Sequence, residues 1–222
     1  MTDPVIPDVQ LVENNSQRTP CVLVLDGSGS MQGGPIDELN AGLKILEEEL
    51  KADSTASVRV QLLVIRAGDN DEVEVLQDWT DAMTFEAPTL VAHGRTPIGA
   101  AMELALDKIA EQKDNYDANG IPSTRPWIML ISDGIPTDPH WQEAAQRCRD
   151  AEADKRVAVF PIGTAEANLD VLGQFATKRA LKLQGLKFKE LFLWLSRSVT
   201  SASKAAPDQT TQLPAPDGWA EI

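Results

Sequence analysis

The sequence predicts a doubly wound α/β domain with a six-stranded, mostly parallel sheet, one antiparallel edge strand and helices on both faces. Two observations lead to this prediction. Short, continuously apolar runs of strand length alternate along the chain with longer segments whose apolar residues have helical spacing. Strands that alternate with helices favour a parallel sheet covered on both faces. With 222 residues, the chain is long enough for one such domain with a full core.

The first elements are two strands with a long helix between them. Residues 21–25 form the first buried-strand candidate, and residues 58–65 alternate in part between apolar and other side chains. Gly34-Pro35 opens the intervening helix. Its apolar residues follow helical spacing and are Ile36, Leu39, Leu43, Leu46 and Leu50.

A hairpin is expected next, because residues 73–76 follow a turn at residues 68–71 that is rich in Gly, Asp and Asn. The acidic segment 69–72 is a possible calcium site. A hairpin turn of this composition needs no ion, however, so we expect an ordinary turn.

The second half of the chain continues the alternation of helices and strands. A polar surface loop is expected at residues 113–125, between the fourth strand and the helix before it. The other expected elements are helix 97–109, strand 127–132, a helix that starts at Asp138-Pro139, strand 157–162, short helix 169–175, edge strand 181–183 and closing helix 190–199.

Composition divides the chain into a domain and two flanking segments. Residues 1–17 are polar and predict a short leader, with a possible edge strand at residues 9–12. Residues 18–201 form the predicted domain. Residues 202–222 shift to Ala, Pro, Asp, Thr and Gln, which predicts a disordered or loosely attached tail.

Charge and cysteine content narrow the possible functions. The net charge of −14 argues against nucleic acid and anionic membranes as partners. The longest apolar runs have strand length, and the N-terminus lacks the basic region and apolar core of a secretory signal. Cys21 and Cys148 fall in a strand and a helix, which is typical of reduced, intracellular thiols. We therefore expect a cytoplasmic protein.

The most informative motif follows the first strand, where Asp26, Ser28 and Ser30 alternate with glycines. Alternate side chains in a turn at a strand end can converge on one point, and Gly27 and Gly29 allow the backbone to fold tightly enough. One carboxylate with two neutral hydroxyls forms a hard-oxygen set that suits Mg²⁺. Alone the motif is weak, because Asp, Gly and Ser also form ordinary turns.

Two later segments supply the rest of a possible metal site. Thr96 lies in the run His93-Gly94-Arg95-Thr96-Pro97, and Asp133 follows strand 127–132 in a strand-then-Asp-Gly arrangement like that of Asp26. Each also has an ordinary explanation, since a threonine before proline can cap a helix and Ser132-Asp133-Gly134 can be a plain turn. A threonine oxygen can serve both purposes. Asp26 and Asp133 both fall at carboxyl ends of strands, where doubly wound sheets bind ligands.

Together these motifs resemble the von Willebrand factor type A (VWA) family, whose Rossmann-like fold carries a metal-ion-dependent adhesion site (MIDAS). The family's Asp-x-Ser-x-Ser, distant Thr and distant Asp match Asp26, Ser28, Ser30, Thr96 and Asp133, and the resemblance covers about residues 18–200. It implies that these five residues hold Mg²⁺, with Mn²⁺ or Ca²⁺ as other candidates. Within the family, the chain resembles bacterial tellurium-resistance TerY-type proteins through segments such as 87–96 and 192–199. Residues 64–68 depart from many relatives, which carry a Phe followed by a small polar residue there, and we expect this departure to affect the sheet more than the metal.

The resemblance implies a non-enzymatic, metal-dependent binding module that accepts an Asp or Glu of a partner protein. For the TerY type it implies a role in chemical stress, with a protein kinase and a metal-dependent phosphatase as candidate partners. Because the chain is acidic, we expect such a partner to be basic around its acidic residue. The alternative is a haloacid-dehalogenase-type phosphoryl-transfer hydrolase, but its second Asp would be at the position of Ser28. A purely structural protein with a vestigial site is the third hypothesis.

Overall fold

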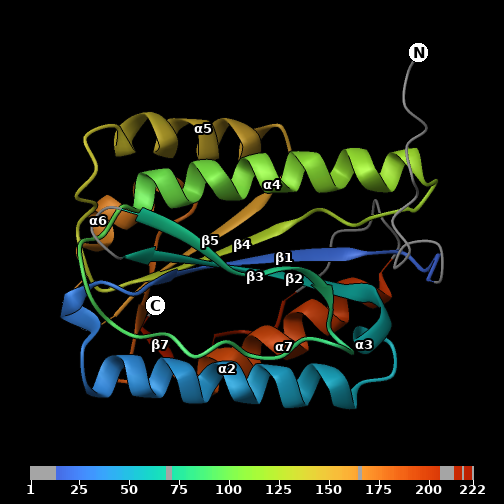
Figure 1. Cartoon of the computed structure of the whole chain (residues 1–222), viewed down its shortest axis with the longest axis horizontal. Helices are drawn as coiled ribbons and strands as arrows, with labels where there is room; N and C mark the ends of the chain where they lie inside the picture. The colour runs from blue at the N-terminus through green and yellow to red at the C-terminus, as the bar shows by residue number, and fades with distance from the viewer. Residues whose placement is uncertain (1–13, 69–71, 165–166, 206–212, 217, 222) are drawn as a thin grey trace.

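The computed structural model describes residues 14–68, 72–164, 167–205, 213–216 and 218–221. Its centre is one sheet with the strand order β3-β2-β1-β4-β5-β6-β7 (Figure 1). The strands are β1 (Thr19–Asp26), β2 (Val60–Gly68), β3 (Glu72–Asp81), β4 (Trp127–Ser132), β5 (Ala158–Gly163), β6 (Leu181–Leu183) and β7 (Ala220–Glu221).

The predicted fold class is confirmed. Strands β2, β1, β4, β5 and β6 run parallel, and β3 is the antiparallel edge strand beside β2. The two-residue strand β7 is an addition, because it pairs antiparallel with β6 at the other edge. The chain builds one half of the sheet outward from β1 and then returns to build the other half from β4. The strand order therefore reverses between β1 and β4, where doubly wound sheets bind ligands.

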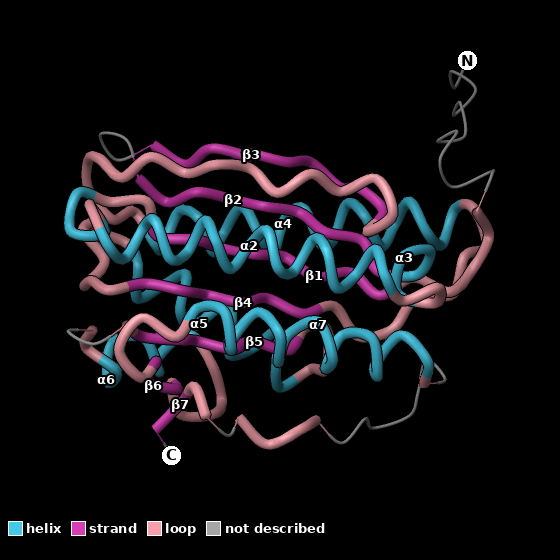
Figure 2. Tube along the Cα trace, turned by 90° about the horizontal axis from the view of Figure 1, so that it is seen from below, coloured by secondary structure: helices cyan, strands magenta, loops and turns pink. Residues whose placement is uncertain are grey.

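Helices cover both faces of the sheet. Helices α4 (Ile98–Ala118) and α5 (Trp141–Ala153) lie on one face, and α2 (Gly34–Ala52) and α7 (Phe188–Lys204) lie on the other (Figures 1 and 2). The short elements are α3 (Ala56–Arg59), α6 (Leu169–Leu172) and the single 3₁₀ turns η1 (Gly29–Met31) and η2 (Gly173–Phe175). No described helix combines the length and apolar character that are needed to cross a bilayer.

Strand β1 shows why the central strands are continuously apolar. All of its residues are buried, and successive side chains point to opposite faces. Cys21, Leu23 and Leu25 belong to the core under α2 and α7, whereas Val22 and Val24 belong to the core under α4 and α5. Both faces are thus dry, and a polar residue on either one would lose its contact with water.

Two expectations from the sequence were wrong in their boundaries. Residues 113–118 continue α4 rather than forming a loop, because Tyr116 is buried and donates a hydrogen bond to Gln61 of β2. The helix predicted at Asp138 begins at Trp141 instead. The possible strand at residues 9–12 and the segment 69–71 lie outside the described residues.

The expectation of a loosely attached tail is corrected for its described part. Helix α7 runs past residue 201 to Lys204, and Trp219 is 1% exposed, with its ring centroid 5.2 Å from that of Trp194. The indole N–H of Trp194 donates to the Pro214 carbonyl at 2.8 Å. These aromatic contacts bury apolar area that polar composition alone could not predict.

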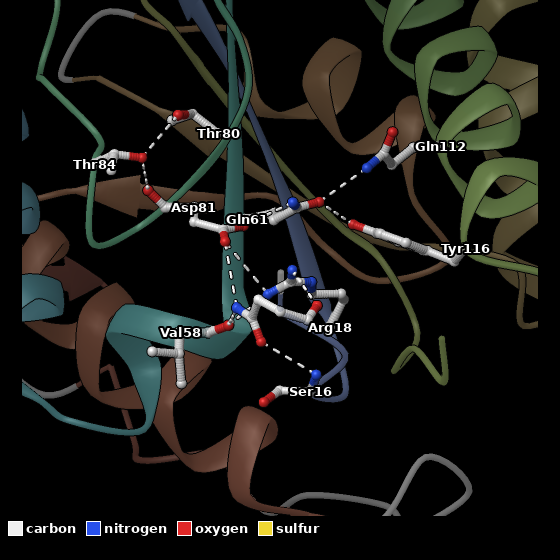
Figure 3. Close-up of polar contacts among 10 residues, drawn as sticks. Ser16, Arg18, Val58, Gln61, Thr80, Asp81, Thr84, Gln112 and Tyr116 are labelled. Atoms are coloured by element: carbon white, nitrogen blue, oxygen red, sulfur yellow. Dashed lines mark hydrogen bonds and ion pairs between the residues drawn. The ribbon is translucent and has the colours of Figure 1, made fainter. Parts of the chain in front are cut away.

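A polar cluster closes the amino-terminal end of β1 (Figure 3). Arg18 is fully buried, donates to the carbonyls of Val58 at 2.6 Å and Asn14 at 2.8 Å, and lies 3.4 Å from the Asp81 carboxylate. Asp81 also accepts a 2.7 Å hydrogen bond from the Gln61 amide. The cluster therefore joins the start of β1 to β2 and to the end of β3.

Candidate metal centre

The predicted site residues lie at the carboxyl ends of β1 and β4, where the strand order reverses. The two strands are neighbours, with Leu25 in register with Ile131. Asp26 ends β1 and Asp133 directly follows the end of β4. The turn after β1 and the turn after β4 therefore leave the sheet side by side.

Backbone hydrogen bonds fix the turn after β1. Gly27 N–H donates to the Ala67 carbonyl at 2.8 Å, and His93 N–H donates to the Gly27 carbonyl at 2.8 Å. Gly29 N–H donates to the Gly94 carbonyl at 3.1 Å. Because Gly94 is two residues before Thr96, these bonds bring the threonine loop against the Asp-x-Ser-x-Ser turn.

Gly27 has a second role, because the side chain of Arg66 covers it. A Cβ atom at Gly27 would lie 2.7 Å from both Cγ and Cδ of Arg66, so a larger residue would have to displace the arginine. Arg66 Nη2 lies 3.3 Å from His93 Nε2 and 3.7 Å from the Glu74 carboxylate. We expected the departure at residues 64–68 to affect the sheet more than the metal, yet the side chain of Arg66, in this run, packs on the turn that carries the predicted ligands.

Three of the predicted ligands form a continuous row of oxygen atoms. The hydroxyl oxygens of Ser28 and Ser30 are 3.0 Å apart, and Ser30 Oγ donates to Asp133 Oδ1 at 2.8 Å. Ser28 is buried, Ser30 is exposed and Asp133 is partly buried. The row therefore runs from the interior to the surface and ends where a ligand from solvent can reach it.

Asp26 lies beneath this row and is 1% exposed. Its Oδ1 accepts the Ser28 N–H at 2.9 Å, and its Oδ2 accepts the Ser132 hydroxyl at 2.5 Å. Burial raises the pKa of the Asp26 carboxyl, the hydrogen bonds from Ser132 and Ser28 oppose this shift, and the nearby charge of Asp133 adds to it. The described groups that shift the pKa of Asp26, which are Ser132, Ser28 and Asp133, are neutral or negative, so a cation at this place would offset the cost of the buried charge.

Thr96 approaches from the other side of Gly134. A Cβ atom at Gly134 would lie 3.5 Å from Thr96 Oγ1 and 3.8 Å from Asp26 Oδ2, so these two oxygens flank the same glycine. The structure therefore places Thr96 beside the other four predicted residues, although it joins them through loop packing. The Thr96 N–H donates a hydrogen bond to the Thr137 hydroxyl at 3.1 Å.

The helix cap expected from Thr96 is supplied by another residue. Asp138 accepts the N–H groups of Gly99 at 3.2 Å and Ala100 at 3.0 Å, at the start of α4. The N-cap residue of this helix is Pro97, which makes no side-chain cap, and Thr96 Oγ1 lies beside Gly134. A carboxylate at a helix N-terminus is also favoured by the helix dipole.

Sequence reasoning also missed Ser132 as part of the site. It is fully buried, donates to Asp26 and accepts the Gly134 N–H at 3.0 Å, so it joins the two aspartate-bearing turns. Its position directly before Asp133 was the available signal. The contact itself links residues 26 and 132, which no local pattern predicts.

The arrangement fits a small, hard divalent cation. An octahedron with metal–oxygen distances of about 2.0–2.1 Å places neighbouring oxygens about 2.9 Å apart. The two contacts in the row, 3.0 Å and 2.8 Å, are hydrogen bonds of ordinary length that also fall close to that spacing. The described residues contain no group of three or more His, Cys, Asp or Glu side chains that could hold a metal.

Fold and site together define a doubly wound domain with an oxygen-lined site at its switch point. The sequence profile of the von Willebrand factor type A domain matches residues 21–189. The chain therefore belongs to the VWA family. A comparison with curated proteins gives no match.

Solved structures support the same fold. Proximal thread matrix protein 1 from the mussel byssus, in a form described as having a zinc-occupied MIDAS motif, has a TM-score of 0.58 at 16% identity and covers 84% of this chain and 48% of its own. A von Willebrand factor type A protein from Catenulispora acidiphila has a TM-score of 0.61 at 16% identity, covering 83% and 43%. The pilus adhesin SpaC from Lactobacillus rhamnosus GG has a TM-score of 0.64 at 10% identity, covering 85% and 31%. This chain thus spans less than half of each of these proteins.

Proposed function

We propose that the protein is a non-enzymatic, metal-dependent binding module in which Asp26, Ser28, Ser30, Thr96 and Asp133 form a MIDAS-type site. The observation that carries this proposal is the row of oxygens from Ser28 to Asp133, spaced at 3.0 Å and 2.8 Å. Ser28, Ser30 and Thr96 would contact the ion through their hydroxyls. Asp133 and Asp26 would act directly or through water, and the carboxylate of Asp26 is already fixed by two hydrogen bonds.

Mg²⁺ is the proposed ion, and Mn²⁺ and Ca²⁺ are the alternatives. Mg²⁺ keeps several waters and uses few carboxylates, which suits a site of three hydroxyls and two aspartates. Neutral hydroxyls leave the ion electron-poor, so it gains from an incoming carboxylate. The ion would therefore present an open position for an Asp or Glu of a partner protein.

A partner with basic residues around that Asp or Glu would suit a chain with a net charge of −14. We also propose that the protein acts in the cytoplasm, in a bacterial chemical-stress or tellurium-resistance response. Its candidate partners are a protein kinase and a metal-dependent phosphatase. This proposal rests on the TerY-type segments of the sequence. The functional unit would be residues 18–201, and the described end of the tail packs against it through Trp219 and β7.

The geometry does not favour a hydrolase. A nucleophilic aspartate must reach its substrate, but Asp26 is 1% exposed and both of its oxygens already accept hydrogen bonds. The position two residues later, where such an enzyme needs its acid or base, is Ser28. A non-enzymatic role therefore remains the proposal.

Calorimetry and thermal melting with Mg²⁺, Mn²⁺ and Ca²⁺, each against a chelator, test the metal site. Capture of partners from native lysate in Mg²⁺ and in chelator then tests binding. The Asp26→Asn variant should lose both the stabilisation by metal and the metal-dependent capture of partners. The control is Asp117→Asn, which changes an exposed aspartate near the far end of α4 and should keep both. Unchanged melting with every ion, and no heat of binding, would refute the proposal.

A further inference from the structure

A groove of about 910 Å³ lies at the end of the sheet opposite the candidate metal centre. Trp127 and Ala158, the first residues of β4 and β5, line it, together with the last turns of α4 and the end of α5. Phe160 and Leu213, which are only partly buried, add apolar surface to its walls. A groove with this lining can bury an apolar side chain of a ligand.

The charge of the groove is opposite to that of the protein. Six basic residues line it, against the single acidic residue Asp114; they are Lys113, Arg125, Arg147, Lys155, Arg156 and Lys178. The whole chain has 20 Lys and Arg against 34 Asp and Glu. A local excess of positive charge in so acidic a protein concentrates attraction for anions at this one place.

Hydrogen bonds hold the wall of the groove between α4 and α5. Arg125 donates to the carbonyl of Val157 at 2.5 Å and to that of Glu152 at 2.8 Å. Lys113 Nζ donates to the Ser123 hydroxyl at 2.7 Å. The loop before β4 is thereby tied to the ends of both helices.

The buried carboxylate of Glu152 fixes the opposite wall. It accepts the N–H and the hydroxyl of Thr177 at 2.5 Å and 2.7 Å, and also the N–H of Val159 at 3.2 Å. Thr177 directly precedes Lys178. Lys178 is therefore held beside the end of α5 before any ligand arrives.

The three lysines among the six basic residues have no acidic partner in the described part of the chain, although Lys113 is already hydrogen-bonded to the Ser123 hydroxyl. Arg147 pairs with Glu103 and Asp107, Arg156 pairs with Asp154 at 3.3 Å, and Arg125 is engaged by carbonyls. Among the described residues, no acidic group lies within 4.0 Å of the ammonium groups of the remaining three, which are Lys113, Lys155 and Lys178. Lys155 and Lys178 are exposed.

We propose that this groove binds an acidic polypeptide segment of a partner protein. Its carboxylates would meet Lys113, Lys155 and Lys178, and an apolar side chain would lie on the apolar wall. A nucleic acid fits less well, because flanking acids such as Glu103 and Asp154 would repel a long polyanion.

Fluorescence anisotropy with a fluorescein-labelled peptide of alternating Glu and Leu, at low salt, tests the proposal. The double variant Lys155→Gln/Lys178→Gln should weaken binding about tenfold, because two exposed charges each contribute modestly. The control Lys189→Gln/Arg197→Gln removes two charges from exposed positions of α7 that do not line the groove, and should bind as the parent does. Binding should weaken with salt and be insensitive to chelator, which separates it from the metal centre.

Several results would overturn the proposal. They are no binding at any peptide concentration, equal binding by the groove variant, and equal binding of a peptide with Ser in place of Leu. Preferential binding of a single-stranded oligonucleotide would assign the groove to nucleic acid instead. Self-association of the parent that the groove variant loses would assign it to a second copy of this chain.

Discussion

Two buried aspartates end strands at opposite ends of the sheet, and they are stabilised in different ways. Asp81, the last residue of β3, has a cation from the chain itself, since Arg18 lies 3.4 Å away and Gln61 donates a hydrogen bond at 2.7 Å. Asp26, the last residue of β1, receives hydrogen bonds from Ser28 and Ser132 and a repulsive charge from Asp133.

This difference separates a structural ion pair from the site that we propose to bind a metal. A buried carboxylate with its own arginine is complete, and breaking the pair would leave a buried charge. A buried carboxylate with only neutral donors has an unfavourable charged state, and for this reason burial raises the pKa of Asp26. A divalent cation would supply at Asp26 the positive charge that Arg18 supplies at Asp81.

The largest effect on stability is expected from a substitution of Asp81, which pairs with Arg18. Asp81→Asn should lower the free energy of unfolding by about 3–5 kcal/mol, because it leaves the fully buried Arg18 without its counter-charge. Urea denaturation measures this, and Mg²⁺ should not restore the loss. Asp78→Asn, on the exposed side of the same strand, is the control and should be nearly neutral. Equal stability of Asp81→Asn and the parent would remove the contrast between the two ends.

Asp26→Asn should act mainly on the metal response. The amide can keep the hydrogen bond from Ser28 N–H and can donate to Ser132, so the metal-free stability should change by about 1 kcal/mol or less. The parent should gain about 2.7 kcal/mol when the ion is present at 100 times its Kd, and the variant should not. Melting curves in Mg²⁺ and in chelator measure both quantities. A variant that keeps the full gain would show that Asp26 is not needed for the ion.

Thr96 and Asp138 separate ligand binding from helix capping. Asp138→Ala should cost about 1 kcal/mol of stability through the lost cap on α4. Thr96→Val keeps the shape of the side chain and should leave metal-free stability nearly unchanged, while it lowers Mg²⁺ affinity. Paired melting and calorimetry distinguish the two variants. A large loss of metal-free stability in Thr96→Val would mean that the hydroxyl is structural.

The smallest effect at neutral pH concerns the two cysteines. Burial raises the pKa of Cys21 and of Cys148 to about 12 from the ordinary value of 9.0. The folded state therefore holds these protons longer than the unfolded state does, so their contribution to stability is complete below pH 9 and is lost as the pH rises toward 12. Between these two pKa values the free energy of unfolding falls by about 1.4 kcal/mol per pH unit for each thiol. Urea denaturation across this pH range should show a shallower fall of the free energy of unfolding with pH for Cys148→Ala than for the parent. An identical fall in the two proteins would contradict the raised pKa of Cys148.

The sequence alone predicted the alternation of strands and helices, which the structure confirms, and the five oxygen-bearing residues of the proposed site. Both depend on local patterns, since apolar periodicity records which faces are buried and the motif residues lie at strand ends. The parallel sheet then followed, because helices between strands allow little else.

Only the tertiary structure decided which distant groups complete each site. Ser132 reaches Asp26, Asp138 caps α4 in place of Thr96, and Arg18 pairs with Asp81. The tertiary structure also shows that Trp219 is buried against Trp194, although the tail has the composition of a loosely attached segment. Such contacts join residues far apart in the chain, and their energies depend on burial and distance. Neither quantity can be read from local spacing.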